Sequence, residues 1–173
     1  MPTSTKSSPA QSGLLTLFTN ELRDILWAET QLFKTLPKLA AKAKSPALKT
    51  AFTSHCKETE GQIERLEQIF EQLGLKPKAE KCEAMAGLLE EGASLMKEFA
   101  KSPALDAALI SAGQKVEHYE IATYGTLCAF AKRLGLHEAL PLLTQTLKEE
   151  GAADKKLTAI AEGEANAEAE DEE

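Results

Sequence analysis

Apolar residues recur at spacings of three and four along four long stretches of the chain, which is the period of an amphipathic α-helix. In the first stretch they include Leu22, Ile25 and Leu36. The pattern predicts four helices, each about 40 Å long at roughly 1.5 Å per residue. Their predicted ranges are residues 13–42, 46–73, 103–134 and 137–161.

Residues that start and stop helices mark the ends of these stretches. Ser45 followed by Pro46 is typical of a helix N-terminus, because the serine side chain caps free backbone N–H groups and proline needs none. Gly74 is typical of the residue that follows a helix C-terminus. The sequence KSPAL occurs at 44–48 and again at 101–105, which predicts the same capping device at the start of the third long helix.

The lengths of the connections predict the topology. Short links join the first long helix to the second and the third to the fourth, whereas about 28 residues separate the second from the third. Residues 79–100 of that link form a shorter amphipathic stretch, which predicts a short extra helix or helix pair. Short links produce antiparallel neighbours, and one long crossover produces the ferritin-like order. The sequence therefore predicts an all-α, ferritin-like four-helix bundle with a long crossover that contains this extra segment.

The charge distribution divides the chain into three parts. Residues 1–12 are rich in Ser, Thr and Pro and are expected to form a disordered lead-in to a bundle over 13–161. Residues 162–173 are expected to form an acidic, disordered tail that holds seven of the 27 acidic residues. The other 20 match the 20 basic residues, so the bundle has no excess of positive charge. This balance argues against nucleic acid as a partner.

The remaining composition limits the compartment and the class of site. No apolar run approaches the roughly 20 residues needed to span a membrane, and no signal-peptide pattern opens the sequence. The three cysteines lack the spacing of a thiolate zinc site and are odd in number, which argues against a disulfide framework. We therefore expect a cytoplasmic protein.

Acidic residues interrupt the apolar face of every long helix near its middle. Burying a carboxylate is costly unless it is paired or bound to metal. Glu29 and Glu58 are 29 residues apart and Glu120 and Glu150 are 30 apart, so folding each hairpin brings both pairs to comparable heights. Such a site predicts two divalent metal ions, iron or manganese, with zinc also compatible, and we expect the Tyr124 hydroxyl to bond one of its carboxylates. The predicted metal ligands are Glu29, His55, Glu58, Glu117, Glu120, Glu150 and Asp154.

Each of these residues also has an interpretation without metal. A single Glu at the edge of a core is usually solvated, and a single buried histidine is more often hydrogen-bonded than metal-bound. Arg23, Lys57 and Arg65 lie near the edges of the apolar faces, and ion pairs from them would make metal unnecessary. His118 points about 100° away from Glu117 on its helix, which favours a surface or interface role. A rotated helix would make His118 a ligand.

Six stretches carry a family resemblance: ELRDILWAE at 21–29, LPK at 36–38, HCKETEGQIERL at 55–66, KCEAM at 81–85, residues 106–124 with EHYEIATY, and residues 145–150 followed by Asp154. The chain resembles the YciF/YciE-like family of bacterial stress proteins over about residues 14–161. The resemblance implies a ferritin-like fold, a dinuclear metal centre, dimers and a role in stress responses, with the biochemical activity undefined. Better-known di-iron bundles carry Glu-x-x-His on two helices. Here the second helix has the reverse order, His55-x-x-Glu58, and the fourth has Glu150-x-x-x-Asp154.

These observations favour a cytoplasmic dimetal protein that protects the cell under stress. The expected chemistry is oxidation of Fe(II) or disposal of peroxide, with Glu58 and one of Glu117 or Glu120 bridging the ions. One alternative is a structural or interaction bundle without catalytic metal, and a second is a manganese-dependent, catalase-like enzyme. We expect a homodimer with no nucleic-acid or membrane partner. The sequence leaves open whether the protein is an enzyme.

Overall fold

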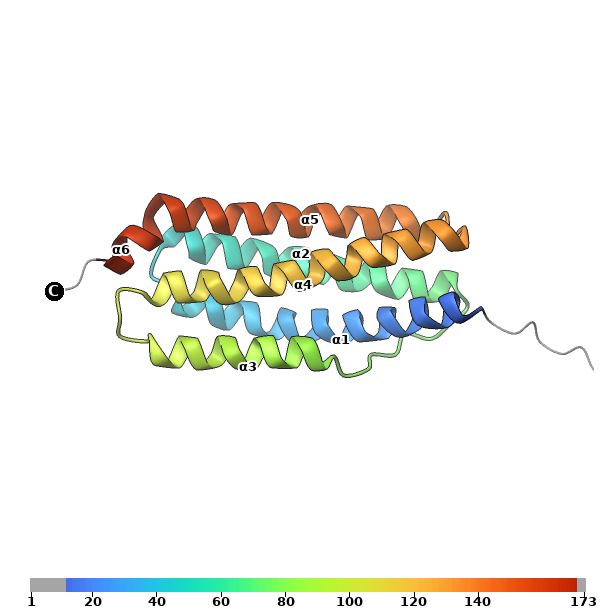
Figure 1. Cartoon of the computed structure of the whole chain (residues 1–173), viewed down its shortest axis with the longest axis horizontal. Coiled ribbons are helices and arrows are strands. Elements are labelled where there is room, and N and C mark those ends of the chain that lie inside the picture. The colour runs from blue at the N-terminus through green and yellow to red at the C-terminus, as the bar shows by residue number, and fades with distance from the viewer. Residues whose placement is uncertain (1–11, 171–173) are drawn as a thin grey trace, which may run out of the picture.

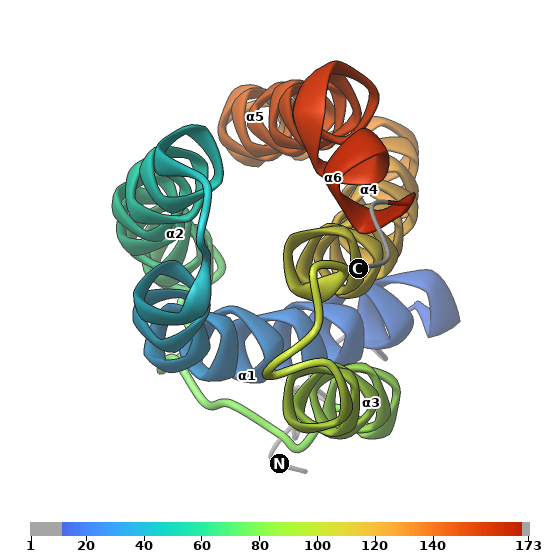
Figure 2. The ribbon, with the colours of Figure 1, turned by 90° about the vertical axis from the view of Figure 1, so that its left-hand side faces the viewer.

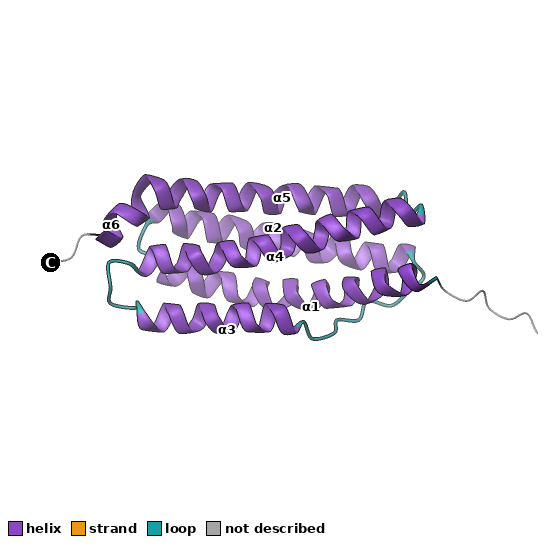
Figure 3. Ribbon diagram, in the orientation of Figure 1, coloured by secondary structure: helices purple, strands orange, loops and turns teal. Residues whose placement is uncertain are grey.

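The structure, a computed structural model, describes residues 12–170, and its regular elements are all helices (Figure 1, Figure 3). No strand occurs in this part of the chain, which confirms the predicted all-α class. Within the same residues no helix is both long and apolar enough to cross a membrane. The elements are α1 (Gly13–Lys42), α2 (Pro46–Gln72), α3 (Glu83–Glu98), α4 (Leu105–Leu134), α5 (Ala139–Ile160), the π-helical turn η1 (Ala161–Ala165) and α6 (Asn166–Glu170).

The four long helices α1, α2, α4 and α5 surround the core, and α3 lies outside this ring (Figure 2). α1 packs beside α2 and α4, and α5 packs beside α4 and α2. Neighbouring long helices run in opposite directions, while α2 and α4 run in the same direction (Figure 1). That order arises because the connection between α2 and α4, which includes α3, runs back along the length of the bundle. It is the predicted ferritin-like order.

The apolar stripe of each long helix faces the centre of the bundle. Burying these side chains provides the main driving force for packing, about 25 cal/mol for each Å² of apolar surface removed from water. The largest apolar side chains that are almost completely buried are Phe18, Leu22, Ile25, Leu48, Leu66, Ile69, Phe70, Met85, Leu109, Ile110 and Leu127.

A group of polar contacts fixes the start of α3 against α1 and α4. Cys82 caps α3, because its Sγ accepts the N–H of Met85 at 3.2 Å. The same sulfur lies 3.1 Å from the hydroxyl of Tyr119, which donates to Asp24 at 2.7 Å. The backbone N–H of Glu80 donates to a carbonyl of α1 at 3.0 Å. The extra segment of the crossover is therefore one anchored helix.

The two copies of KSPAL behave differently. In the first, the Ser45 side chain accepts backbone N–H groups at the start of α2, as predicted. In the second, Ser102 and Pro103 lie in a turn, and α4 begins at Leu105 without a side-chain cap. The predicted start at residue 103 is thus two residues too early. The N–H of Ser102 bonds the carbonyl of Phe99 at the end of α3, so this copy closes the tight turn between α3 and α4.

The helical chain extends beyond the predicted boundary at residue 161. The turn η1 and the helix α6 continue it to Glu170, where the sequence predicts a disordered tail. Two small side chains, Ala161 and Ala165, are buried, and this segment contacts α4. Glu164 accepts a hydrogen bond from the Ser45 hydroxyl. Of the predicted lead-in over residues 1–12, residues 1–11 lie outside the described residues, and Ser12 caps α1; the last residues, 171–173, also lie outside them.

Candidate metal centre

Four side chains from three helices meet inside the bundle. They are His55 of α2, Glu117 and Glu120 of α4, and Glu150 of α5. One potential ligand atom from each lies within 4.8 Å of the others. All four residues are buried, and Glu120 and Glu150 have no exposed surface. The structure therefore brings together four of the seven predicted ligands.

The imidazole of His55 lies between carboxylates on both sides. Its Nε2 lies 3.3 Å from Oε1 of Glu117 and 3.6 Å from Oε2 of Glu150. Its Nδ1 lies 3.3 Å from Oε2 of Glu58, whose side chain is 40% exposed. If Nδ1–H donates to Glu58, the lone pair of Nε2 is directed at the carboxylates of Glu117 and Glu150. Glu58 is thus placed to orient His55, as an outer carboxylate commonly does for a metal-binding histidine.

Glu29 reaches the same region from α1 and is completely buried. Its Oε1 accepts a hydrogen bond from the Tyr124 hydroxyl at 2.5 Å, which confirms the expected tyrosine–carboxylate bond. Its Oε2 has no hydrogen-bond partner. Glu29 is not one of the four clustered residues, but it leaves one free carboxylate oxygen beside them.

Asp154 lies apart from this cluster, one turn beyond Glu150. Its carboxylate accepts from Gln114 at 3.2 Å and lies 3.3 Å from Nε2 of His118. The His118 side chain is 69% exposed, so it faces away from the core as predicted. Asp154 is therefore not one of the four clustered residues, because one helical turn moves its carboxylate along the bundle axis.

Buried oxygen atoms without partners gather at this place. They belong to the carboxylates of Glu29, Glu117, Glu120 and Glu150 and to the amide of Gln62, and Glu120 leaves both of its oxygens unpaired. Oxygens of this kind cost stability unless something else satisfies them. The Nε2 of His55 also lacks a hydrogen-bond partner. A cation bound among His55, Glu117, Glu120 and Glu150 would provide a partner for unpaired atoms of all four residues.

The basic residues expected to pair with the inner acids lie elsewhere. Arg23 pairs with Glu80 of the crossover. Arg65 pairs with Glu149, outside the cluster. Lys57 is exposed. Among the ion pairs of the described residues, none joins a Lys or Arg to the four clustered residues or to Glu29.

The surroundings change the pKa values of the clustered groups. Burial, with repulsion from Glu150, raises the pKa of Glu29 to about 8, and burial likewise raises that of Glu117 to about 8. Burial also raises the pKa of Glu120 and Glu150 well above the usual range. Burial alone would lower the pKa of His55, but its bond to Glu58 and the nearby carboxylates raise it. Without metal, this site therefore favours bound protons.

One residue of the site went unpredicted. Gln62 is completely buried on α2, and its side-chain amide donates to Oε1 of Glu150. That contact holds one oxygen of Glu150 and leaves the other free. Gln62 is the last residue of the H-x-x-E-T-x-x-Q pattern and lies two turns after His55. Because residues two turns apart share a helix face, this spacing could have predicted that Gln62 belongs to the site.

The donor set is compatible with a particular class of metal. Three carboxylates and one imidazole, with Glu29 beside them, suit iron, manganese or zinc, because these ions bind oxygen together with nitrogen. No cysteine belongs to the cluster, which disfavours metals that prefer thiolates. This fit supports the predicted class of metal.

Comparison with known proteins gives relatives over most of the chain. Protein YciF of Escherichia coli strain K12 is 48% identical over 155 residues, covering 89% of this chain and 93% of that protein. The crystal structure of the E. coli stress protein YciF has a TM-score of 0.85 at 46% identity, covering 90% and 99% of the two chains. YcfI of Rhodopseudomonas palustris, provisionally described as a structural protein, has a TM-score of 0.84 at 44% identity, with the same coverage.

A more distant structure and a family model agree with these relatives. A Xanthomonas campestris protein has a TM-score of 0.70 at 19% identity, covering 88% of this chain and 93% of that one, and thus shares the fold. Residues 13–170 match the family model described as a domain of unknown function, DUF892. The match spans every helix of the described chain, so this protein is a member of the DUF892 family and a relative of the stress protein YciF.

Proposed function

We propose that this protein binds divalent metal in the middle of its bundle and acts in the bacterial stress response. The observation that carries the proposal is the set of buried carboxylate oxygens without partners around His55. His55, Glu117, Glu120 and Glu150 would hold one ion. Glu29, with one free oxygen, would contribute to a second, and Glu58 would orient His55 from outside the cluster.

The proposed chemistry is oxidation of Fe(II) or disposal of peroxide. Peroxide would be the electron acceptor: two bound Fe(II) or Mn(II) ions would each supply one electron, and one peroxide would take up two protons and leave as two waters. The protein would provide a dry site and fixed carboxylates, and the Tyr124 hydroxyl would hold Glu29 in place. The role in stress rests on the similarity to the stress protein YciF. We propose that the protein works in the cytoplasm as a homodimer. Light scattering in solution, which measures the molar mass, tests the dimer.

Metal uptake tests the proposal directly. Protein stripped with a chelator and incubated with Fe(II) or Mn(II) under anaerobic conditions should hold about two ions per chain by elemental analysis, with a raised melting temperature. Glu29→Ala combined with Glu120→Ala should abolish both effects. The double variant Glu64→Ala with Glu67→Ala, which changes two exposed acids of α2, is the matched control. No bound metal and an unchanged melting temperature would rule the proposal out.

A structural or interaction role is the second candidate. The description of YcfI favours it, since that protein is 44% identical and has the same fold. If the role is structural, removing the inner acids should stabilise the bundle and leave its cellular role intact. Complementation of a strain lacking the gene with the Glu29→Ala, Glu120→Ala variant separates the two candidates. Full protection by that variant would favour the structural role.

A further inference from the structure

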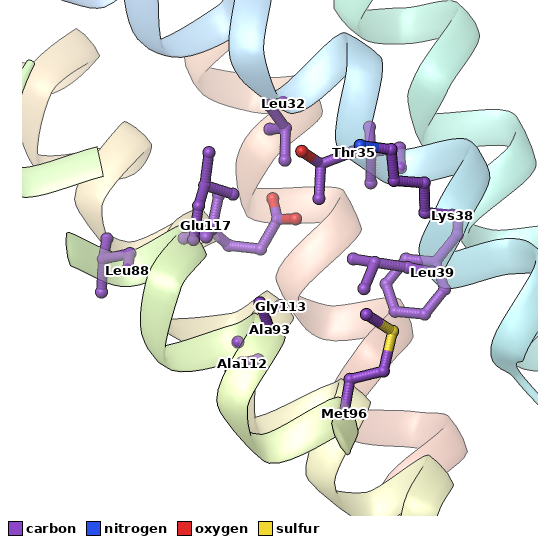
Figure 4. Close-up of a pocket in the computed structure, with 15 residues that line it drawn as sticks. Leu32, Thr35, Lys38, Leu39, Leu88, Ala93, Met96, Ala112, Gly113 and Glu117 are labelled. Atoms are coloured by element: carbon purple, nitrogen blue, oxygen red, sulfur yellow. The ribbon is translucent and has the colours of Figure 1, made fainter. Parts of the chain in front are cut away.

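A cavity of about 150 Å³ lies where α1, α3 and α4 meet (Figure 4). Its walls are mostly apolar, with Leu39 from α1, Leu88 and Met96 from α3, and Val116 from α4. Exposed Lys38 is on the rim, so the cavity has a solvent side. Protein interiors are normally filled to crystal-like density, and an unfilled space of this size costs stability.

Small residues on α3 and α4 shape the cavity. Gly92 of α3 faces Ala112 of α4, and a Cβ at Gly92 would lie 3.4 Å from the Ala112 Cβ. This close approach holds α3 against α4 at one point. The longer side chains on α3, Leu88 and Met96, lie one turn to either side and form walls of the cavity. α3 lies outside the ring of four long helices and covers this space. A plain four-helix bundle has no counterpart of α3.

Glu117, a residue of the candidate metal centre, is also part of the cavity wall. Glu117 lines the cavity while 3% of its surface is exposed, and its Oε2 has no hydrogen-bond partner. Figure 4 shows its carboxylate directed between Leu32 of α1 and Gly113 of α4. Its other oxygen, Oε1, lies 3.3 Å from His55. One carboxylate therefore forms part of the cavity wall and part of the four-residue cluster.

We propose that this cavity binds a small apolar molecule of about the size of benzene and holds it against Glu117. The volume and lining carry the proposal, because an apolar cavity of about 150 Å³ in another protein stays dry and binds benzene or xenon. Binding requires no metal. The assignment of the molecule as a substrate of the centre does rest on the proposed function.

Benzene is the probe that tests this inference on the metal-free protein. Spectra of protein labelled with ¹³C at Leu and Met methyl groups should show saturable shifts at Met96, Leu39 and Leu88 on titration. Thr35→Phe should weaken binding at least tenfold, because Thr35 lies on the wall contributed by α1 and a phenyl ring there would fill the space. Its hydroxyl bonds a carbonyl of its own helix, so its loss removes no contact between helices.

Thr53→Phe is the matched control, because exposed Thr53 makes the same bond to its own helix on α2 and is not part of the cavity. It should bind benzene as the unchanged protein does. Thr35→Leu replaces Thr35→Phe if the larger side chain prevents folding. Absence of saturable shifts, or equal binding by the Thr35 variant, would overturn the inference. Metal uptake, measured after a separate portion of each metal-free protein is incubated with Fe(II) or Mn(II), tests the proposed function independently, so either idea can fail alone.

Discussion

At the scale of single residues, Glu120 has more unpaired buried side-chain atoms than any other described residue. It is completely buried, and neither of its carboxylate oxygens has a hydrogen-bond partner. Burial, followed by repulsion from Glu150 and Glu29, raises its pKa well above the usual range. At pH 7 and without metal, folding must therefore keep this group protonated, which opposes folding relative to the ionised group in the unfolded chain.

Glu120→Gln should consequently stabilise the metal-free protein while weakening metal binding. The amide has nearly the same shape and cannot ionise, so we expect a gain of about 1–3 kcal/mol in the free energy of unfolding at pH 7. Urea denaturation of chelator-treated protein measures this gain, and elemental analysis measures the lost metal. Glu67→Gln, at an exposed position of α2, is the control. A destabilised Glu120→Gln protein with full metal content would contradict the assignment.

Glu58 is predicted to act on metal through His55. The bond to His55 lowers the pKa of Glu58, so it is ionised and able to hold Nδ1–H of the ring. Glu58→Gln should weaken metal binding about 10–100-fold, the usual effect of losing an outer carboxylate, with little change in melting temperature. Competition with a chelator of known affinity measures this. Glu60→Gln, exposed on the same helix, should leave affinity unchanged. An affinity loss above about 1,000-fold would indicate that Glu58 binds metal directly.

The spacing of residues in the sequence predicts which face of a helix a side chain lies on. It predicts the position of that side chain along the bundle axis only roughly. Glu150 and Asp154 share a face of α5, yet only Glu150 joins the cluster. His55 and Glu58 also share a face, and the one-turn offset places the histidine inside and the glutamate half exposed. These offsets depend on the tilt and rotation of each helix, which the apolar pattern does not fix. Six of the seven predicted ligands nevertheless belong to the cluster or lie beside it.

At the scale of elements, helix ends depend on contacts that are distant in sequence. The start of α2 is held from α4: the carboxylate of buried Asp106 accepts the N–H of Lys44 at 2.8 Å and of Ser45 at 2.6 Å. Ser45 alone was visible as a capping residue. The partner 61 residues away could not be identified, because no local pattern marks an acid that caps another helix.

Asp106→Asn tests the strength of this link. The amide can accept one of the two N–H groups but not both equally, and it lacks the charge that strengthens such bonds. We expect a loss of about 1–3 kcal/mol in the free energy of unfolding, measured by urea denaturation. Asp106→Ala should cost more, because both donors would lose their acceptor. Metal content per folded chain should stay constant, and a variant as stable as the parent would show that water replaces the carboxylate.

At the scale of the whole molecule, connection lengths predict the topology because they leave few ways to join the helices. The direction of α4 relative to α2 follows from one crossover that is long enough to return along the bundle. No pattern in the sequence predicted the cavity beneath α3. It depends on how closely α3 approaches α4 at Gly92, a distance set by packing in three dimensions.

The pH dependence of stability should show whether the cluster is built for protons or for metal. The pKa of Glu29 and of Glu117 is about 8 in the folded protein, against 4.5 without the protein environment. Between these values the unfolded chain has released protons that the folded protein retains. Without metal, the contribution of these two groups to stability is therefore fully present below about pH 4.5 and is lost as pH rises towards 8, by about 1.4 kcal/mol per pH unit for each retained proton.

Metal replaces those protons, so its binding should strengthen over the same range. We expect the melting temperature of metal-free protein to fall from pH 5.5 to pH 8, and that of metal-loaded protein to fall less. The gap between the two curves should widen with pH, and a pH indicator should record proton release when metal is added at pH 7. Glu29→Gln combined with Glu117→Gln should make the metal-free curve less steep, because neither amide titrates, while Glu120 and Glu150 still retain protons. Parallel curves with no proton release would mean that the buried acids serve packing rather than metal.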